Sequence, residues 1–357
     1  MRDPVESFLT AAGWADAARD AIPGDAGTRR YLRLRRGSDP AVLMIAPRAA
    51  EGAGEPEGAT VEDRRAIGYN ALARLAGPHL EAFLAIAQAL TRRDLSAPRI
   101  LAHDIPAGLA LLEDFGDADL FRVLDAEPER EAELYEAAVD TLAAIYRSTF
   151  ADQAEIGDHC WRIRDYDEAA LLAEMDLCLD YYAPDVGRTL DARAREAFTA
   201  AWREAFAVLG AQTHGLALRD FHAQNLFWLP TREGAARIGL IDFQDALFAH
   251  PAYDLSSLIE DIRRDVSEDL FDPLKQRFCA AAGIAHDDAF EAAYHVQAAQ
   301  RATKLLGFPV RADRDFNKPQ YRALLPRVRR HLQRDLSHPA CAGIRAWFED
   351  YIPEALQ

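Results

Sequence analysis

Residues 218–225 read Leu-Arg-Asp-Phe-His-Ala-Gln-Asn, and residues 238–243 read Ile-Gly-Leu-Ile-Asp-Phe. Between these two stretches, the apolar run at 226–229 and a following turn predict a strand that pairs with 238–241 as a β-hairpin. Such a hairpin would return Asp242 to the side of Asn225. The sequence therefore predicts a loop and a hairpin that carry Asp220, Asn225 and Asp242.

These three side chains are of the types that phosphoryl transfer from ATP requires. A carboxylate must orient and deprotonate the attacking hydroxyl, and oxygen ligands must hold Mg²⁺ against the phosphates. We predict Asp220 as the catalytic base, and Asn225 and Asp242 as the metal ligands. The alternative is that Asp220 is an ordinary turn or cap residue, as a single loop aspartate usually is.

The regions around this stretch differ in their periodicity. On the N-terminal side, polar and apolar residues alternate at 29–36, and apolar runs at 41–45, 100–101 and 109–112 predict further short strands. On the C-terminal side, apolar stripes with helical spacing cover 135–146, 171–182 and 198–209. We therefore expect an α+β fold of two lobes: a small β-rich N-lobe at residues 1–116, and a larger helical C-lobe at residues 117–357 with one hairpin.

Composition excludes several classes of partner. The formal net charge of −17 repels nucleic acid and anionic membranes, and no apolar run approaches the ~18 residues of a membrane span. The four cysteines form no C-x-x-C pair, which favours reduced core thiols. We expect a cytoplasmic protein with a small-molecule partner, and leave its oligomeric state open.

The pattern R-D-x-x-x-x-N, a hairpin and I-D-F at residues 219–243 resembles the aminoglycoside phosphotransferase and choline kinase family, which shares the two-lobed plan of protein kinases. The resemblance implies an ATP- and Mg²⁺-dependent kinase. It also implies a hinge at 111–117 whose backbone meets adenine, and a phosphate-covering loop at 24–31. The ATP-binding residues implied in this way are Glu113, Asp114 and Phe115 in the hinge, and Gly24, Gly27 and Thr28 in the loop.

Two positions depart from that family. Met44 stands where such kinases carry the strand lysine that pairs with the α- and β-phosphates, and no lysine precedes Lys275. Leu218 replaces the histidine that commonly opens the catalytic loop. Any cation that binds the phosphates from the N-lobe must be an arginine, and the candidates, which could equally be surface charges, are Arg30, Arg33 and Arg48.

One subfamily also lacks that lysine, and the resemblance to it is closer: the bacterial anomeric kinases of N-acetylmuramate and N-acetylglucosamine in cell-wall (peptidoglycan) recycling. The shared stretches are 24–31, 41–47, 219–222, 240–246, 250–255, 300–307, 318–319 and 325–327. This resemblance does not explain residues 54–80. The implied reaction converts ATP and an amino sugar to the sugar α-1-phosphate and ADP.

Other polar residues have both a functional and a structural interpretation. The resemblance implies that Asp254 supports the catalytic loop. Asp245 could support the metal ligands or be a solvated turn residue. The candidates for acceptor contacts, which could also be core or surface residues, are Glu174, Tyr181, Tyr182, His222, Arg301 and Lys304. Of these, Arg301 and Lys304 could pair with the lactyl carboxylate of N-acetylmuramate.

Two competing functions remain at this stage. The motifs specify the phosphoryl-transfer groups and not the acceptor, so a kinase of an aminoglycoside, choline or homoserine is the first alternative. A nucleotide-binding pseudoenzyme is the second, because the strand lysine and the loop histidine are missing. The presence of Asp220, Asn225 and Asp242 together favours an active enzyme.

Overall fold

A computed structural model describes residues 3–23, 29–46, 53–75, 79–211 and 213–357. The chain divides into two compact units. The first comprises Met1–Thr141, Ser148–Arg164 and Gln224–Ala246, and the second comprises Leu142–Arg147, Asp165–Ala223 and Leu247–Gln357. The chain thus passes from the second unit to the first inside the predicted catalytic stretch, while the lobe boundary at residue 116 stays a prediction.

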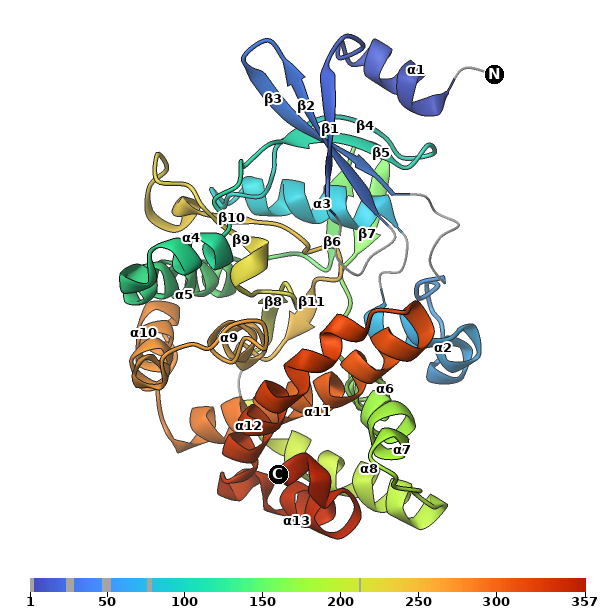
Figure 1. The fold of residues 1–357 in the computed structure, drawn as a ribbon, viewed down its shortest axis with the longest axis vertical. Coiled ribbons are helices and arrows are strands. Elements are labelled where there is room, and N and C mark those ends of the chain that lie inside the picture. The colour runs from blue at the N-terminus through green and yellow to red at the C-terminus, as the bar shows by residue number, and fades with distance from the viewer. Residues whose placement is uncertain (1–2, 24–28, 47–52, 76–78, 212) are drawn as a thin grey trace. The chain divides into compact units, whose positions relative to one another are not determined.

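The first unit contains an antiparallel five-stranded sheet in the order β1-β2-β3-β5-β4 (Figure 1). Its strands are β1 (Ala18–Ile22), β2 (Arg30–Arg36), β3 (Asp39–Ile45), β4 (Ile100–Asp104) and β5 (Leu109–Glu113). The predicted strands are confirmed, and β1 is an addition. Because the residues of β1 are all exposed or half-buried, its sequence lacks the apolar alternation that identifies a strand.

Helices complete the core of the first unit. Helix α1 (Pro4–Ala11) begins at Asp3, whose carboxylate accepts from the Val5 N–H, and it buries Phe8 and Leu9 against the sheet. Helix α3 (Leu80–Thr91) is almost entirely buried. Between β3 and α3 lie helix α2 (Val61–Ile67) and one π-helical turn, Asn70–Arg74.

The first unit also contains the predicted hairpin. That hairpin exists as β9 (Leu226–Trp228) and β10 (Ile238–Leu240), which pair antiparallel. Its edges bond to the rest of the unit, since the Leu240 N–H donates to Ser96 and the Trp228 N–H donates to Ala118. The other elements are α4 (Leu120–Ala126), the start of α5 (Glu131–Arg147), β6 (Gln153–Ile156) and β7 (His159–Arg162).

The second unit is helical, as predicted. Its elements are α6 (Glu168–Leu177), α7 (Ala183–Asp185), α8 (Ala192–Phe206), β8 (Gly215–Ala217), β11 (Leu247–Ala249), α9 (Ala252–Ile259), α10 (Phe271–Ala282), α11 (Asp288–Phe316), α12 (Leu325–Leu336) and α13 (Ala342–Tyr351). Helix α11 is central and packs on α6, α9 and α12. The prediction of a single hairpin beyond residue 116 is wrong, because β6 pairs with β7 and β8 pairs with β11 as well.

Two features adapt α6 to α11. After Leu177 the helix continues as a π-helical turn, Cys178–Tyr182. At the same place Gly307 of α11 approaches the α6 backbone so closely that a Cβ atom there would lie 2.1 Å from the Leu177 carbonyl oxygen. A glycine is therefore required at this crossing. No helix in the described part of the chain is both long and apolar enough to cross a membrane.

Candidate active site

The loop that carries Asp220 follows β8 in the second unit and is held by Asp254. The Asp254 carboxylate, at the start of α9, accepts hydrogen bonds from the Leu218 N–H at 2.5 Å and the Arg219 N–H at 2.9 Å. Burial raises the pKa of Asp254 to about 7, and the Asp220 charge adds to this rise, whereas the two N–H groups oppose it. This is the geometry expected of a residue that supports the loop.

Arg219 is fixed through its side chain as well. It has a positive φ of 73°, and its guanidinium donates to the Glu174 carboxylate of α6. Glu174 also accepts from the Tyr166 hydroxyl and, at 2.5 Å, from the Lys304 ammonium of α11. We call Tyr166, Glu174, Arg219 and Lys304 the Glu174 cluster.

The Glu174 cluster contains a buried, ionised carboxylate. Glu174 has an exposed fraction of 0%. Burial alone would raise the pKa of its carboxyl group, but the charges of Lys304 and Arg219 outweigh burial and lower the pKa to about 2. Two cations and one hydroxyl therefore compensate a charge that would be costly to bury alone.

This arrangement shows the present partners of the predicted acceptor contacts, whose roles stay predictions. Glu174 has its two oxygens occupied by three donors and no exposed surface, so it does not offer a sugar contact in this structure. Tyr182 is a core residue whose hydroxyl donates to the Glu354 carbonyl at 3.3 Å. Tyr181 is half-buried and donates to Asp315 at 2.7 Å. Lys304 binds Glu174, so its predicted contact with an acceptor carboxylate would compete with that ion pair.

His222 and Arg301 are buried beside the loop. The exposed fractions of His222 and Arg301 are 3% and 7%. Burial, with the positive charges of Arg263 and Arg301, holds the pKa of His222 well below its ordinary value, so its ring is neutral. The roles of His222 and Arg301 toward an acceptor stay predictions.

Asn225 and Asp242, the candidate metal ligands, lie at the same end of the β9–β10 ladder in the first unit. The Asn225 carbonyl accepts from the Ile241 N–H at 3.1 Å, which places Asp242 next to it as the hairpin pattern predicted. Gln244 donates from Nε2 to Asp242 Oδ1 at 2.9 Å. Asp242 has a positive φ of 61°.

This donor set suits Mg²⁺ bound together with a nucleotide. Mg²⁺ usually takes one or two protein oxygens and completes its shell with phosphates and water. The carboxylate of Asp242 and the amide oxygen of Asn225, both on half-buried residues, match this coordination preference. Among the described residues, no group of three or more His, Cys, Asp or Glu side chains could hold a metal ion by itself, without phosphate and water ligands.

Two contacts anchor the metal loop, which we define as residues 242–246. The Phe243 ring is fully buried and stacks on Phe83 of α3, with ring centroids 4.9 Å apart. Asp245 accepts from Nε and Nη2 of Arg74 at 2.9 Å and 2.8 Å. Asp245 is therefore a buried, paired residue, not a solvated turn residue. The sequence did not identify Arg74 as a functional residue, because Arg74 lies within residues 54–80, which contain no recognisable motif.

The predicted ATP-binding residues are only partly described. Gly24, Gly27, Thr28 and Arg48 lie outside the described residues. Arg30 is exposed at the start of β2, and Met44 is fully buried, so the usual lysine position belongs to the core here.

Arg33 bonds to the end of the predicted hinge. Its Nε lies 2.7 Å from Asp114 Oδ2, and its Nη1 and Nη2 donate to Asp117 and to the Gly116 carbonyl at 2.8 Å and 2.9 Å. An Arg33 that bound phosphates would have to leave these partners.

The rest of the hinge packs on the hairpin. The Glu113 carboxylate accepts from Arg232 at 2.7 Å. The Phe115 ring packs on Phe227, and it lies so close to Gly239 that a Cβ atom there would be 2.8 Å from the ring. These contacts join the hinge to the hairpin that ends in Asp242. Adenine binding by this hinge stays a prediction.

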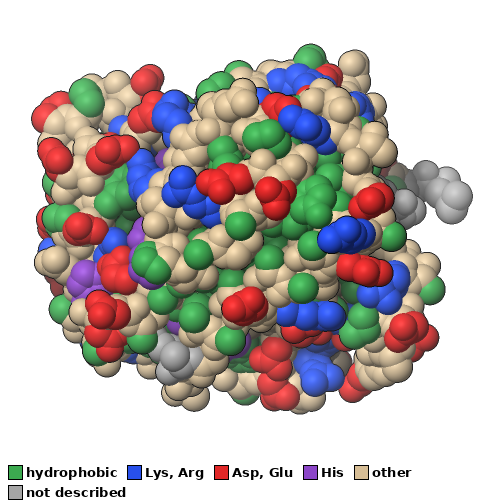
Figure 2. Space-filling view, turned by 90° about the horizontal axis from the view of Figure 1, so that it is seen from below, with side chains coloured by type: hydrophobic (Ala, Val, Ile, Leu, Met, Phe, Trp, Pro, Cys, Tyr) green, Lys and Arg blue, Asp and Glu red, His purple; other side chains and the backbone are tan. Residues whose placement is uncertain are grey.

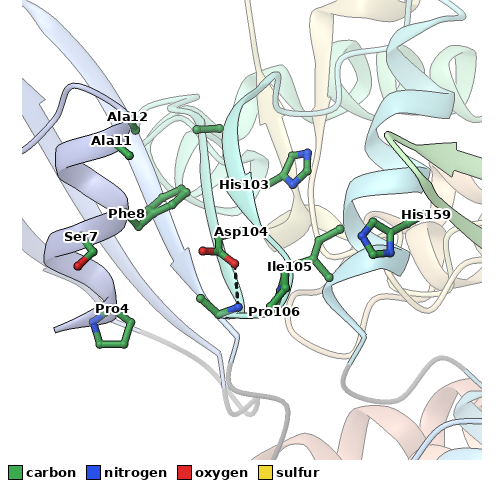
Figure 3. Close-up of a pocket in the computed structure, with 12 residues that line it drawn as sticks. Pro4, Ser7, Phe8, Ala11, Ala12, His103, Asp104, Ile105, Pro106 and His159 are labelled. Carbon is green, nitrogen blue, oxygen red and sulfur yellow. Dashed lines mark hydrogen bonds between the residues drawn. The ribbon is translucent and has the colours of Figure 1, made fainter. Parts of the chain in front are cut away.

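One cavity of about 620 Å³ in the first unit is separate from these residues (Figure 3). It is lined by α1, the β4–β5 turn and His159, and none of the predicted site residues is in its lining. Asp104 accepts from the Ala107 N–H at 2.9 Å within it, which closes the turn. On the face shown in Figure 2, acidic and basic side chains are interspersed, with no continuous basic patch.

Comparisons with known proteins agree with this arrangement. The model of the phosphotransferase enzyme family matches residues 20–294. An N-acetylmuramate/N-acetylglucosamine kinase from Caulobacter vibrioides is 40% identical over 97% of this chain and 95% of its own length. A kinase of the same name from Pseudomonas aeruginosa is 28% identical over 92% of this chain and 88% of its own.

Solved structures share the fold at low identity. A putative aminoglycoside phosphotransferase from Ralstonia eutropha has a TM-score of 0.60 at 13% identity and covers 97% of both chains. A choline kinase from Streptococcus pneumoniae has a TM-score of 0.58 at 11% identity and covers 94% of this chain and 98% of its own. The family match, the near full-length relative and the two-lobed kinase-like fold agree, and the chain belongs to the phosphotransferase enzyme family.

Proposed function

We propose that the chain is an ATP- and Mg²⁺-dependent kinase that phosphorylates the anomeric hydroxyl of N-acetylmuramate or N-acetylglucosamine. The observation that carries the proposal is the 40% identity to a kinase of that name over nearly the whole chain. The retained Asp220, Asn225 and Asp242 support it, because a decayed kinase usually loses one of these groups. A role in cell-wall recycling would follow from this activity.

In the proposed reaction, Asp220 accepts the proton of the anomeric hydroxyl as its oxygen forms a bond to the γ-phosphorus. The bond between that phosphorus and the oxygen bridging to the β-phosphate breaks, and ADP leaves with the bonding electrons. Asn225 and Asp242 would hold Mg²⁺, which neutralises charge on the β- and γ-phosphates when bound. The anomeric hydroxyl is more acidic than other sugar hydroxyls, so a single carboxylate needs less driving force to deprotonate it.

The buried supports explain how Asp220 could act in this way. Asp254 fixes the two backbone N–H groups just before Asp220, and the Glu174 cluster fixes the side chain of Arg219. The residue on the N-terminal side of Asp220 is thus fixed at both its backbone and its side chain. A base held in place before the reaction contributes more than one that must be ordered during it.

The test is ADP release with a panel of acceptors. Free N-acetylglucosamine and N-acetylmuramate should drive ADP release, whereas an aminoglycoside, choline and homoserine should not. The 1-O-methyl glycosides keep the ring hydrogen bonds but lack the reacting hydroxyl, so they should inhibit without turnover. Turnover with the glycosides would move the reaction to another hydroxyl, and turnover only with the other acceptors would refute the proposal.

A further inference from the structure

The contact between Arg74 and Asp245 joins residues 54–80, in which the sequence analysis found no motif, to the metal loop. Two nitrogens of the guanidinium donate to the same Asp245 oxygen, at 2.9 Å and 2.8 Å. The Asp245 side chain is 8% exposed and the Arg74 side chain is 28% exposed. A bond of this kind, charged on both sides and largely out of water, is among the stronger side-chain hydrogen bonds.

The metal loop is short enough for this contact to reach Asp242. The Ala246 N–H donates to the Phe243 carbonyl at 3.0 Å and closes the loop into a turn. Gln244, next to Asp245, donates to Asp242 Oδ1. A displacement of Asp245 would therefore move the side chain that orients Asp242.

The backbone of Asp242 needs such support. Its φ of 61° lies in the left-handed region, which is costly for a residue with a side chain and persists only where the surroundings hold it. The Phe243 ring, stacked on Phe83, holds the loop at one point. Arg74 holds it at a second point, two residues further along the chain.

We propose that Arg74 is a positioning residue for the metal loop, and that it thereby raises the affinity for the metal–nucleotide complex. Arg74 acts through Asp245 and Gln244 and touches neither the metal nor the substrate. The proposal rests on the proposed function insofar as Asp242 binds Mg²⁺ with ATP. It gives Arg74 a role that the sequence alone did not reveal.

The experiment measures ATP binding by calorimetry as a function of Mg²⁺ concentration, with no acceptor present, so that a wrong acceptor does not affect it. Removal of a group that orients a metal ligand typically weakens metal binding about 10- to 100-fold. Arg74→Ala should therefore raise the Mg²⁺ concentration for half-maximal ATP binding at least about 10-fold. Arg74→Lys, which keeps the charge, should recover part of that loss.

Arg130→Ala is the matched control. Arg130 lies in the same unit and has a 24% exposed side chain, and within the described part of the chain its guanidinium donates to Glu127 and Glu133 and not to the metal loop. Its Mg²⁺ requirement should equal that of the unaltered protein. An equal rise in both variants, or no rise in Arg74→Ala, would overturn the proposal.

A double-mutant cycle guards against a variant that merely folds poorly. Asp245→Asn alone should also raise the Mg²⁺ requirement, and the double variant should be no worse than the more affected single variant, because both changes break one contact. Additive losses would overturn the proposal. Unaltered protein that binds ATP without any Mg²⁺ dependence would instead refute the metal assignment in the proposed function.

Discussion

The catalytic loop and the metal loop are held in different ways. In the second unit, Asp254, Glu174 and Arg219 hold the loop of Asp220, and none of the three is more than 4% exposed. In the first unit, a buried ring stack and an ion pair with a 28% exposed arginine hold the metal loop. Removal of one partner from a fully buried ion pair leaves the other charge uncompensated in the interior, which destabilises the fold strongly. The residues that hold the catalytic loop therefore also stabilise the fold.

Asp220→Asn should give the largest effect, because it removes the catalytic base and leaves the residues that hold its loop in place. The amide keeps the shape of the side chain but cannot accept the proton, so kcat should fall at least ~10²-fold while ATP binding stays nearly intact. Asp242→Asn should instead raise the Mg²⁺ concentration that ATP binding requires, because an amide oxygen is a weaker ligand than a carboxylate. Steady-state kinetics and ATP calorimetry measure the two effects, and near-normal turnover in both variants would refute the assignment.

Glu174→Ala should break the support of the catalytic loop together with the fold. Loss of Glu174 leaves Arg219 buried without its carboxylate, and removal of one partner from a buried pair typically costs about 3–5 kcal/mol of stability. Urea unfolding measures this change. Glu168→Ala, on the same helix and bonded to Arg203 at 2.7 Å, is the control.

Because Glu168 and Arg203 are both more than half exposed, the control variant should change stability little. Equal losses in the two variants would show that the cluster is no more important than a surface pair. The comparison between the two loops would then lose its basis.

Gly307→Ala should disturb the Glu174 cluster from a distance. The added methyl group would meet the Leu177 carbonyl and force α11 away from α6, the two helices that carry Lys304 and Glu174. Overpacking of this kind typically costs about 1–3 kcal/mol, which should exceed the gain in helix propensity. Thermal unfolding should show a lower Tm. Gly343→Ala in α13 should not lower the Tm, because the added Cβ atom would have no neighbouring atom within 4 Å.

The pH dependence of stability gives the smallest effect. The pKa of Glu174 is lowered from 4.5 to about 2 on folding, so its ionisation stabilises the folded protein above pH 4.5, and this contribution is lost as the pH falls toward 2. The difference in stability between the unaltered protein and Glu174→Gln should therefore shrink between pH 5 and pH 3. A difference that is constant over this range would contradict an ionised Glu174.

Much of this arrangement follows from local sequence patterns. The hairpin of β9 and β10, the strands β2 to β5 and the main helices have periodicities that identify them. The three catalytic candidates are recognisable because their spacing is short. Such signals come from residues close together in the chain.

The supports could not be predicted in this way. Arg74 and Asp245 are bonded across a separation of 171 positions, and no short motif reports such a contact. Glu174 has the residue type of a sugar contact, and only the fold shows that it faces Arg219 and Lys304. Strand β1 was missed because none of its residues is buried.

The position of the transferred phosphate shows directly which hydroxyl of the sugar is the acceptor. Phosphorus NMR of the product from N-acetylglucosamine and ATP reports which proton couples to the new phosphoryl group. Transfer to the anomeric hydroxyl should give coupling to the anomeric proton, in the α configuration, with one ADP formed for each sugar phosphate. Coupling to the protons at another carbon of the ring, or ADP release with no sugar phosphate, would contradict it.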